Sequence, residues 1–365
     1  MKPAALVLAV AACAAAPHAA TTPLPATELR LANGMRVVLA PDPGVASVVV
    51  LVRAPAGTAD GDAAELIARA LDTLDAPLEE LGGWSVVQLA RDHTSFVLEV
   101  PGEALARAVF LEAERFMHAS VADAVTRAPA LAAERADRAG TRAGLIAAPA
   151  APATPAGIAA LLRARFAPAA LIVVVTGGFA VAEARRVVAA YFGALPAGGA
   201  SPRAAPASPV GAVLHDRLRE RVTVAFAVPE PFGEDRDALD VAARVLRARL
   251  VGRLGADAAM HVDPPFAIEG PAGAQGAILA ELARLRDTPI ADAELARAIG
   301  AVALEQVTAL EDLAYRAAAL AELVARGART QVLVSPRVLT AASVQAAART
   351  WLAAERAIVV VGDAP

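Results

Sequence analysis

The run Leu171-Ile172-Val173-Val174-Val175-Thr176-Gly177 has a near copy at the end of the chain, Ala357-Ile358-Val359-Val360-Val361-Gly362. Both runs are short, apolar and rich in β-branched residues, which is typical of a buried β-strand. Each follows a helical pattern and a short polar or proline-containing turn. Two unrelated buried strands are one interpretation, but the matching position of the runs in the two halves favours another. The repeat predicts an α+β protein built from a duplicated domain.

Strand and helix patterns recur in a fixed order before each run. In the first half, Asn33-Gly34 predicts a hairpin turn within 29–39, and apolar residues at helical spacing predict a helix from Ala63 to Leu74. The other elements predicted for this half are strands over 45–52, 95–100 and 171–175, and helices that run from 101 to 117, over 121–142, just before 171, and up to 192. The second half predicts strands over 221–228 and 357–361, and helices over 237–253, 276–286, 291–307 with an extension to 326, and 340–352, with Thr340 as the N-cap.

A proline-containing segment divides the chain into two parts. Residues 196–209 are rich in Pro, Gly, Ala and Ser, a composition typical of a linker that proline stiffens. With a short targeting segment removed, we expect one domain over 21–195 and a second over 210–365. Each is predicted to be an antiparallel or mixed sheet packed with helices.

The first 20 residues have the pattern of an export signal. Lys2 precedes an apolar run from Ala4 to Ala16, and small residues suited to cleavage follow. Ordinary cleavage would fall near Ala16 or Ala20, whereas Val10-Ala11-Ala12-Cys13 resembles a bacterial lipobox and would make Cys13 a lipidated N-terminus. Both routes predict an exported, periplasmic protein, and the second would anchor it to the outer membrane through the lipid alone.

Composition argues against several other classes of protein. Hydrophobic residues make up 57% of the 365, but a membrane span needs ~20 predominantly apolar residues, and the best internal candidate, Ala143 to Leu162, is broken by Pro149, Pro152 and Pro155. A net charge of −4 without a basic stripe argues against a nucleic-acid partner. With a single cysteine, neither an internal disulfide nor a cysteine-only zinc site can form.

Several short stretches form an ordered pattern along the chain after the signal. In the first half they are Leu31-Ala32-Asn33-Gly34-Met35-Arg36-Val37-Val38, Leu81-Gly82-Gly83, Arg91-Asp92-His93-Thr94 and Tyr191-Phe192-Gly193-Ala194-Leu195-Pro196. In the second half they are Leu279-Ala280-Glu281-Leu282-Ala283-Arg284-Leu285, Glu294-Leu295-Ala296-Arg297-Ala298 and Leu339-Thr340-Ala341-Ala342-Ser343-Val344. In order and spacing these stretches resemble the pitrilysin/insulinase family of zinc peptidases, and the chain is similar to a half-length member. The resemblance implies two homologous peptidase-like α+β domains.

Family peptidases carry an inverted H-x-x-E-H motif on a helix, in which two histidines bind zinc and the glutamate activates the metal-bound water. The matching helix here reads Glu65-Leu66-Ile67-Ala68-Arg69. Glu65 and Arg69 therefore stand at the histidine positions, and Ala68 stands at the position of the catalytic glutamate. Only the distant glutamate that completes the family's metal shell is kept, as Glu134. The resemblance implies a member without catalytic residues, in which zinc is lost and no cofactor is expected.

The positions that hold substrate in the family are also changed. An asparagine on the strand after Leu-Gly-Gly matches Val86, and an arginine and a tyrosine that face the cleaved bond match Gly255 and Val262. Four histidines lie outside the signal, and none stands three or four residues from another, so the sequence does not indicate a relocated metal site: His93, His118, His215 and His261.

The replacements at the zinc position form a pattern of their own. We expect Glu65, Ala68, Arg69 and Asp72 to share one helix face, away from the apolar residues. Buried carboxylates without partners are costly, so one hypothesis places the Arg69 guanidinium where the metal would be, between Glu65 and Glu134. The alternative is a solvated pair of Glu65 and Arg69 at i,i+4 spacing, which contributes a few tenths of a kcal/mol.

Three functions follow from these features. In the first, the chain is the non-catalytic subunit that pairs with a zinc-bearing homologue around a peptide-processing chamber and helps to hold peptide. In the second, it is a scaffold or assembly protein without any proteolytic role, with a second copy of itself as one partner. In the third, it is a zinc endopeptidase with an unorthodox site. A neighbouring reading frame with an intact H-x-x-E-H would favour the first.

Overall fold

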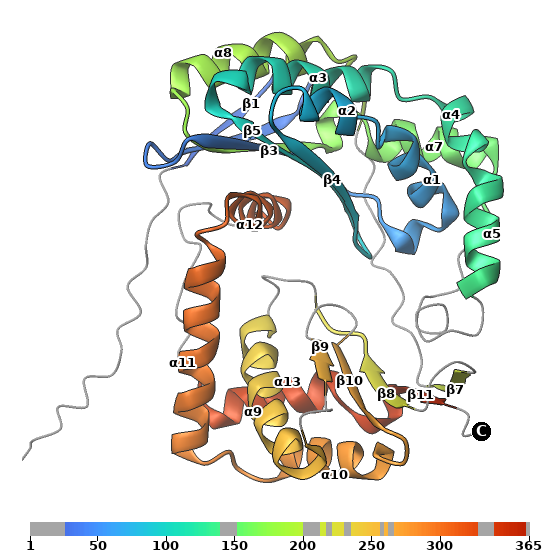
Figure 1. The fold of residues 1–365 in the computed structure, drawn as a ribbon, viewed down its shortest axis with the longest axis vertical. Coiled ribbons are helices and arrows are strands. Elements are labelled where there is room, and N and C mark those ends of the chain that lie inside the picture. The colour runs from blue at the N-terminus through green and yellow to red at the C-terminus, as the bar shows by residue number, and fades with distance from the viewer. Residues whose placement is uncertain are drawn as a thin grey trace, which may run out of the picture.

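The computed structural model describes residues 26–138, 152–199, 212–216, 221–229, 235–255, 259–261, 266–327 and 339–362. The predicted signal with Cys13, the proline-containing stretch after residue 138, residues 200–209 of the predicted linker, and Val262 lie outside the described residues. The described residues form two mixed sheets flanked by helices (Figure 1). None of the helices in these ranges is both long enough and apolar enough to cross a membrane.

The first sheet has six strands in the order β1-β2-β6-β3-β5-β4. They are β1 (Thr27–Arg30), β2 (Arg36–Pro41), β3 (Ser47–Ala54), β4 (Trp84–Leu89), β5 (Thr94–Pro101) and β6 (Ile172–Gly177). The pairing of β2 with β6 is parallel, and every other pairing in this sheet is antiparallel.

The second sheet repeats this arrangement with one strand fewer. Its order is β7-β11-β8-β10-β9, formed by β7 (Ala212–Asp216), β8 (Arg221–Phe226), β9 (Ala259–His261), β10 (Phe266–Pro271) and β11 (Ile358–Gly362). The two repeated runs hold equivalent places, because β6 is parallel to β2 and antiparallel to β3, and β11 is parallel to β7 and antiparallel to β8. The duplicated fold predicted from the repeat is confirmed for five strands, because β2-β6-β3-β5-β4 and β7-β11-β8-β10-β9 follow the same order, whereas β1 has no counterpart.

The predicted hairpin is also present, and it connects two stretches that are far apart in sequence. Gly34 has a φ of 89°, a backbone conformation that glycine adopts at no steric cost. The buried Asn33 donates through Nδ2 to the carbonyl oxygens of Phe192, at 2.8 Å, and Leu195, at 3.2 Å. The β1–β2 turn is thereby tied to the segment that ends the first half of the chain.

Helices flank both sheets, and those of the first half cover one face of the first sheet. In the first half these are α1 (Asp62–Leu71), α2 (Asp75–Glu79), α3 (Leu105–Met117), α4 (Val121–Thr126), α5 (Ala128–Arg138), α7 (Pro155–Arg165) and α8 (Val181–Tyr191). In the second half they are α9 (Arg236–Leu254), α10 (Gln275–Asp287), α11 (Asp292–Ala309), α12 (Leu313–Ala325) and α13 (Ala341–Trp351). Short 3-10 turns lie at Thr58–Asp60, Gly102–Ala104, Pro168–Ala170, Phe192–Ala194 and Ala354–Arg356.

The opposite face of the first sheet is covered by a helix from the second half of the chain. Alternate residues of β3 point to opposite faces, so Val48, Val50 and Val52 join the core with the first-half helices, while Val49 and Leu51 pack with α12. Figure 1 shows α12 beneath the first sheet, on the side away from α3 and α8. With both faces buried, these strands read as continuous apolar runs.

Polar contacts fix α12 to the first sheet. The buried Arg53 of β3 donates through Nη2 to Oε2 of Glu322 on α12 at 2.9 Å, and both residues are 6% exposed. Arg36 donates to the carbonyl of Val324 at 2.7 Å, and Thr176 donates to the carbonyl of Leu313 at 3.1 Å. The two halves are therefore joined by burial and by charge-assisted hydrogen bonds.

Some sequence predictions were wrong in detail. The helix predicted over 121–142 is broken at Arg127 into α4 and α5, because Pro129 cannot donate a backbone hydrogen bond inside a continuous helix. The helix predicted from 291 to 326 breaks before Asp312, whose side chain caps α12 through the N–H of Tyr315. Strands β7, β9 and β10 have no counterpart among the predicted elements. The N-cap at Thr340 is confirmed.

Replacing Glu322 by alanine should destabilise the chain strongly. The change leaves Arg53 buried, and among the described residues the carboxylate that remains in ion-pair range is Asp92 at 3.7 Å. Breaking a buried ion pair by removing one partner costs about 3 kcal/mol. Chemical denaturation would measure the loss of unfolding free energy. The exposed Glu311, just before α12, provides the control: Glu311→Ala should change stability by no more than about 0.5 kcal/mol. Equal effects of the two substitutions would contradict this role for Arg53 and Glu322.

Candidate functional site

The helix that matches the family's zinc-binding helix is α1. It begins after Gly61, whose φ is 78°, and it carries Asp62 and Glu65 in its first turn and Arg69 in its last turn. This charge order suits the helix dipole. Leu66, Ile67 and Leu71 are buried in the first-half core, so the opposite side of the helix presents Glu65 and Arg69 outward.

Arg69 joins the two carboxylates that the sequence hypothesis named. Its Nη1 and Nη2 donate to Oε1 and Oε2 of Glu134 on α5, at 2.7 and 2.8 Å. Nη2 also donates to Oε1 of Glu65 at 2.7 Å, and Nε donates to the same oxygen at 3.2 Å. The predicted contact of Arg69 with both carboxylates is confirmed, and the simple alternative of a solvated i,i+4 pair does not describe it. A two-pronged arginine–carboxylate contact is strong and geometrically specific.

Two residues that the sequence analysis did not single out complete this cluster. Arg135 follows Glu134 on α5, and its Nη2 lies 3.0 Å from Oε2 of Glu65 and 2.7 Å from Oδ1 of Asp62. Their positions in the sequence could have indicated both residues, because Arg135 is adjacent to the retained glutamate and Asp62 precedes Glu65 by one helical turn. The cluster thus contains three carboxylates and two guanidinium groups, which we call the α1–α5 ion cluster.

The electrostatics of the α1–α5 ion cluster keep Arg69 charged. The hydrogen bonds that Arg69 donates to Glu134 raise the pKa of the Arg69 guanidinium above its ordinary value, partial burial opposes the rise, and Glu65 adds to it. The side chains of Glu65, Arg69 and Glu134 are 18%, 31% and 39% exposed. Because solvent reaches all three, the pairs contribute less stability than fully buried pairs would.

The prediction that four residues share one polar face of α1 was partly wrong. Ala68 is only 3% exposed, so it belongs to the buried side of the helix. Asp72 lies at the C-cap, past the last helical residue. Glu65 and Arg69 alone form the outward face of the matched motif.

The residues present do not fit a catalytic zinc. The oxygens of Glu65 and Glu134 already accept from Arg69, and Ala68 offers no base. Over the described ranges, no group of three His, Cys, Asp or Glu side chains is placed to hold a metal ion. His93 has Nδ1 2.6 Å from Oδ1 of Asp92, and the exposed His118 has Nε2 3.2 Å from Oε2 of Glu114. His215 and His261 lie in strands β7 and β9 of the other sheet.

The matched substrate-holding positions are dispersed over the structure. Val86 is half-buried on β4, the strand at one edge of the first sheet, and it packs toward the face that α12 covers. Gly255 ends α9 with a φ of 79° and is exposed. Val262 lies outside the described residues. The edge strand β4 packs against α1.

Comparisons with known proteins identify the fold. No family model matches the sequence, and no curated protein sequence matches it. Among solved structures, a protease from Helicobacter pylori aligns with a TM-score of 0.77 at 17% identity, over 94% of this chain and 100% of that chain. The peptidase M16 inactive domain from Pseudomonas fluorescens aligns with a TM-score of 0.74 at 16% identity, over 94% and 99% of the two chains.

A third solved structure is of a protein much longer than this chain. The periplasmic protease PqqL from Escherichia coli aligns with a TM-score of 0.68 at 14% identity, over 94% of this chain and 48% of that one. The chain therefore spans about half of PqqL. It has the fold of the M16 peptidases, a designation of the pitrilysin/insulinase family, and the resemblance seen in the sequence is confirmed at the level of the fold.

Histidines placed at positions 65 and 69 of the α1–α5 ion cluster should create a metal site. In Glu65→His/Arg69→His, two imidazoles one helical turn apart and Glu134 form a His₂Glu set, which is a known zinc-ligand combination. After dialysis, metal analysis should find about one zinc per chain in this variant. The matched control adds Glu134→Gln, which should lower the zinc content. If the double variant gained no zinc, the side chains at positions 65, 69 and 134 would not lie close enough together to ligate one metal ion.

Proposed function

We propose that this protein is a non-catalytic peptidase homologue that pairs with a zinc-bearing homologue and forms part of the wall of a peptide-processing chamber. The observation that carries the proposal is the contact of Arg69 with Glu65 and Glu134 at the place matched to the zinc site. One guanidinium neutralises carboxylates there, but it supplies no Lewis acid and no activated water. The chain on its own therefore has no group at this place to hydrolyse a peptide.

An open sheet edge supports a role in holding peptide. β4 ends the strand order of the first sheet, and its sequence Trp84-Ser85-Val86-Val87-Gln88-Leu89 contains no charge and no proline. Natural edge strands are usually protected by such residues. An unprotected edge can pair with an extended peptide through backbone hydrogen bonds, and backbone pairing tolerates many peptide sequences. The loss of the asparagine at Val86 removes a side-chain contact but leaves this backbone edge.

We assign the protein to the periplasm. The assignment is supported by the export signal predicted over residues 1–20, and the structurally similar PqqL is named as a periplasmic protease. The lipid anchor at Cys13 stays a prediction.

A cleavage assay in two stages tests the proposal. The purified chain should contain no zinc and should cleave no peptide alone, whereas adding a zinc-bearing homologue from the same organism should give a complex that cleaves peptides faster than the homologue does alone. One zinc per chain together with cleavage by the chain alone would establish the unorthodox peptidase instead. A homologue that is fully active without this chain, and that does not bind it, would favour the scaffold.

Peptide binding at β4 should depend on the edge of the strand. The N–H of Ala90 donates to the carbonyl of His93, and along the continuous β4–β5 register the N–H groups of β4 point alternately toward β5 and away from it, so the N–H of Ser85 faces the open edge. Ser85→Pro therefore removes one outward backbone donor and adds a rigid ring at this edge. Fluorescence anisotropy with a labelled, uncharged, extended peptide should show affinity reduced about tenfold. The control is Glu28→Pro on β1, an exposed position at the opposite edge of the same sheet, which should leave affinity unchanged. Equal losses in both variants would contradict pairing at β4.

A further inference from the structure

The open edge of the first sheet presents the side chains of β4 alternately to two faces. The N–H groups of Ser85 and Val87 face outward from the edge, and those of the even-numbered residues of β4 face β5. Val86 packs toward the face that α12 covers, whereas Val87 packs toward the first-half helices. An extended peptide that pairs with Ser85 would therefore meet different surroundings on the two faces of the sheet.

On the α12 face, the edge begins with a large apolar side chain. Trp84 is 44% exposed, and it shares this face with Val86 because the two residues are two positions apart on one strand. Opposite Trp84, an antiparallel peptide would form a non-hydrogen-bonded pair, in which the two side chains approach most closely. Aromatic side chains stabilise such cross-strand pairs when the partner is aromatic or β-branched. The peptide position opposite Trp84 therefore favours a large apolar residue.

On the other face, the edge is negatively charged. Between residues 70 and 90 the chain has no Lys, Arg or His, and it carries exposed acidic side chains at Asp72, Asp75, Glu79 and Glu80. The hydroxyl of Ser85 donates to Oδ1 of Asp75 at 2.8 Å, so this carboxylate lies beside a residue whose backbone faces the open edge. A peptide residue paired with Ser85 has its side chain on the same face. A basic side chain at that position would lie next to Asp75.

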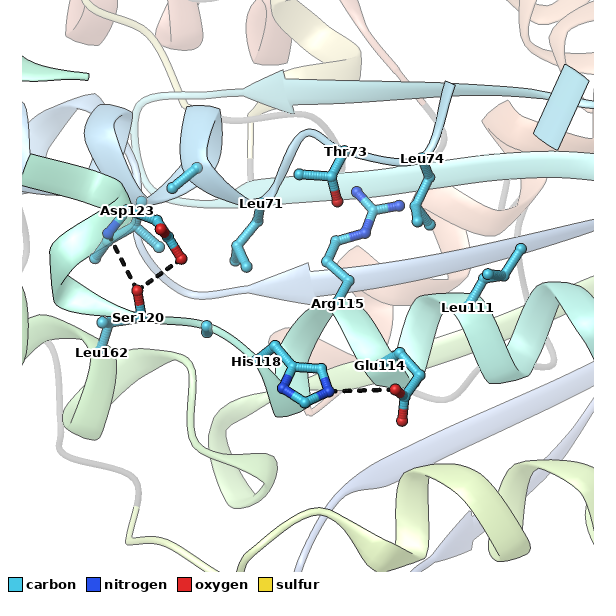
Figure 2. A pocket seen from close by; sticks show the side chains of 13 residues that line it. Leu71, Thr73, Leu74, Leu111, Glu114, Arg115, His118, Ser120, Asp123 and Leu162 are labelled. Carbon is cyan, nitrogen blue, oxygen red and sulfur yellow. Dashed lines mark hydrogen bonds and ion pairs between the residues drawn. The ribbon is translucent and has the colours of Figure 1, made fainter. Parts of the chain in front are cut away.

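Apolar packing holds the acidic segment at the surface. Leu71 and Leu74, on either side of Asp72, are buried and line a mainly apolar cavity between α1, α3 and α4 (Figure 2). Arg115 lines the same cavity, but its guanidinium is paired with Glu112, and both of these side chains are buried. The two leucines thus fix the connection between α1 and α2, and the acidic side chains are left on the outer side.

The charges of this segment are not fully compensated. Burial raises the pKa of Asp72 above its ordinary value, and the charge of Asp75 raises it further, while Arg115 and Arg127 act in the opposite direction. Asp72 therefore senses the repulsion of Asp75 in spite of two arginines nearby. Opposite charge on a partner would relieve this repulsion, which favours a cationic occupant at the edge.

We propose that β4 selects extended peptides in which a large apolar residue lies opposite Trp84 and the adjacent residue, opposite Ser85, is basic. The inference rests on the peptide-holding role proposed above and names the class of peptide that fits it. Consecutive residues of a strand point to opposite faces, so one pair of adjacent residues reaches both Trp84 and Asp75.

Fluorescence anisotropy of the full chain with short labelled peptides tests this selectivity. The reference peptide carries Arg-Phe at the centre of an otherwise all-threonine sequence, with an uncharged dye. Replacing its Phe by Ala should weaken binding about fivefold, because an aromatic cross-strand pair is lost. Replacing its Arg by Glu should also weaken binding about fivefold, because attraction by the acidic segment becomes repulsion. Equal affinities of the three peptides would overturn the proposal.

Two variants of exposed residues assign the selectivity to particular side chains. Trp84→Thr keeps a good strand former and should abolish the preference for Phe over Ala. Asp75→Asn keeps an acceptor for the Ser85 hydroxyl and should reduce the preference for Arg over Glu about threefold. The matched control, Glu28→Gln, removes an exposed charge at the opposite edge of the sheet and should change neither preference. All three variants should retain the thermal melt of the unchanged chain.

Ser85→Pro separates this inference from the proposed function. If Ser85→Pro weakens the binding of every peptide while Trp84→Thr and Asp75→Asn leave both preferences intact, β4 holds peptide without selecting it, and the present inference alone is wrong. If the reference peptide does not bind, or binds equally to Ser85→Pro, the peptide-holding role is wrong and the inference is wrong with it.

Discussion

The guanidinium of Arg69 lies between the carboxylates of Glu65 and Glu134 and donates hydrogen bonds to both of them. It forms four hydrogen-bond contacts with these two groups, all at 3.2 Å or less. The contact also joins two helices, because α1 carries Arg69 and α5 carries Glu134. Arg69 therefore offsets the negative charge of the two carboxylates and holds the two helices together. The proposed loss of catalysis follows from this single substitution pattern.

The position of the α1–α5 ion cluster depends on the duplicated sheets behind it. β6 and β11 hold equivalent places in their sheets, and the first sheet is buried on both faces, by its own helices and by α12 from the second half. The buried pair of Arg53 and Glu322 fixes α12 to this sheet. β4 stays at the edge of this sheet and contacts α1. The first sheet thus has both faces covered, while β4 remains one of its two edge strands.

Sequence patterns predicted those parts of the fold where local chemistry and tertiary packing agree. The β-branched runs, the Asn33-Gly34 turn and the Thr340 cap are of this kind. Breaks at Arg127 and before Asp312 were missed, because apolar periodicity continues across them while a proline and a capping carboxylate end the helices. The contact of Arg69 with Glu134 was predicted from the family pattern, whereas Arg135 and the buried pair Glu112–Arg115 were not. A sequence pattern predicts that charged residues at helical spacing are exposed to solvent. Which of them are buried depends on the packing of the helices, which the pattern does not contain.

Anomalous X-ray diffraction from crystals of the protein grown with excess zinc tests the central claim most directly. The claim predicts density for the Arg69 guanidinium between Glu65 and Glu134, and no anomalous peak at the zinc edge within bonding distance of either carboxylate. A strong zinc peak there, with Arg69 turned away and Glu65 or Glu134 as ligand, would show that this chain retains a metal centre.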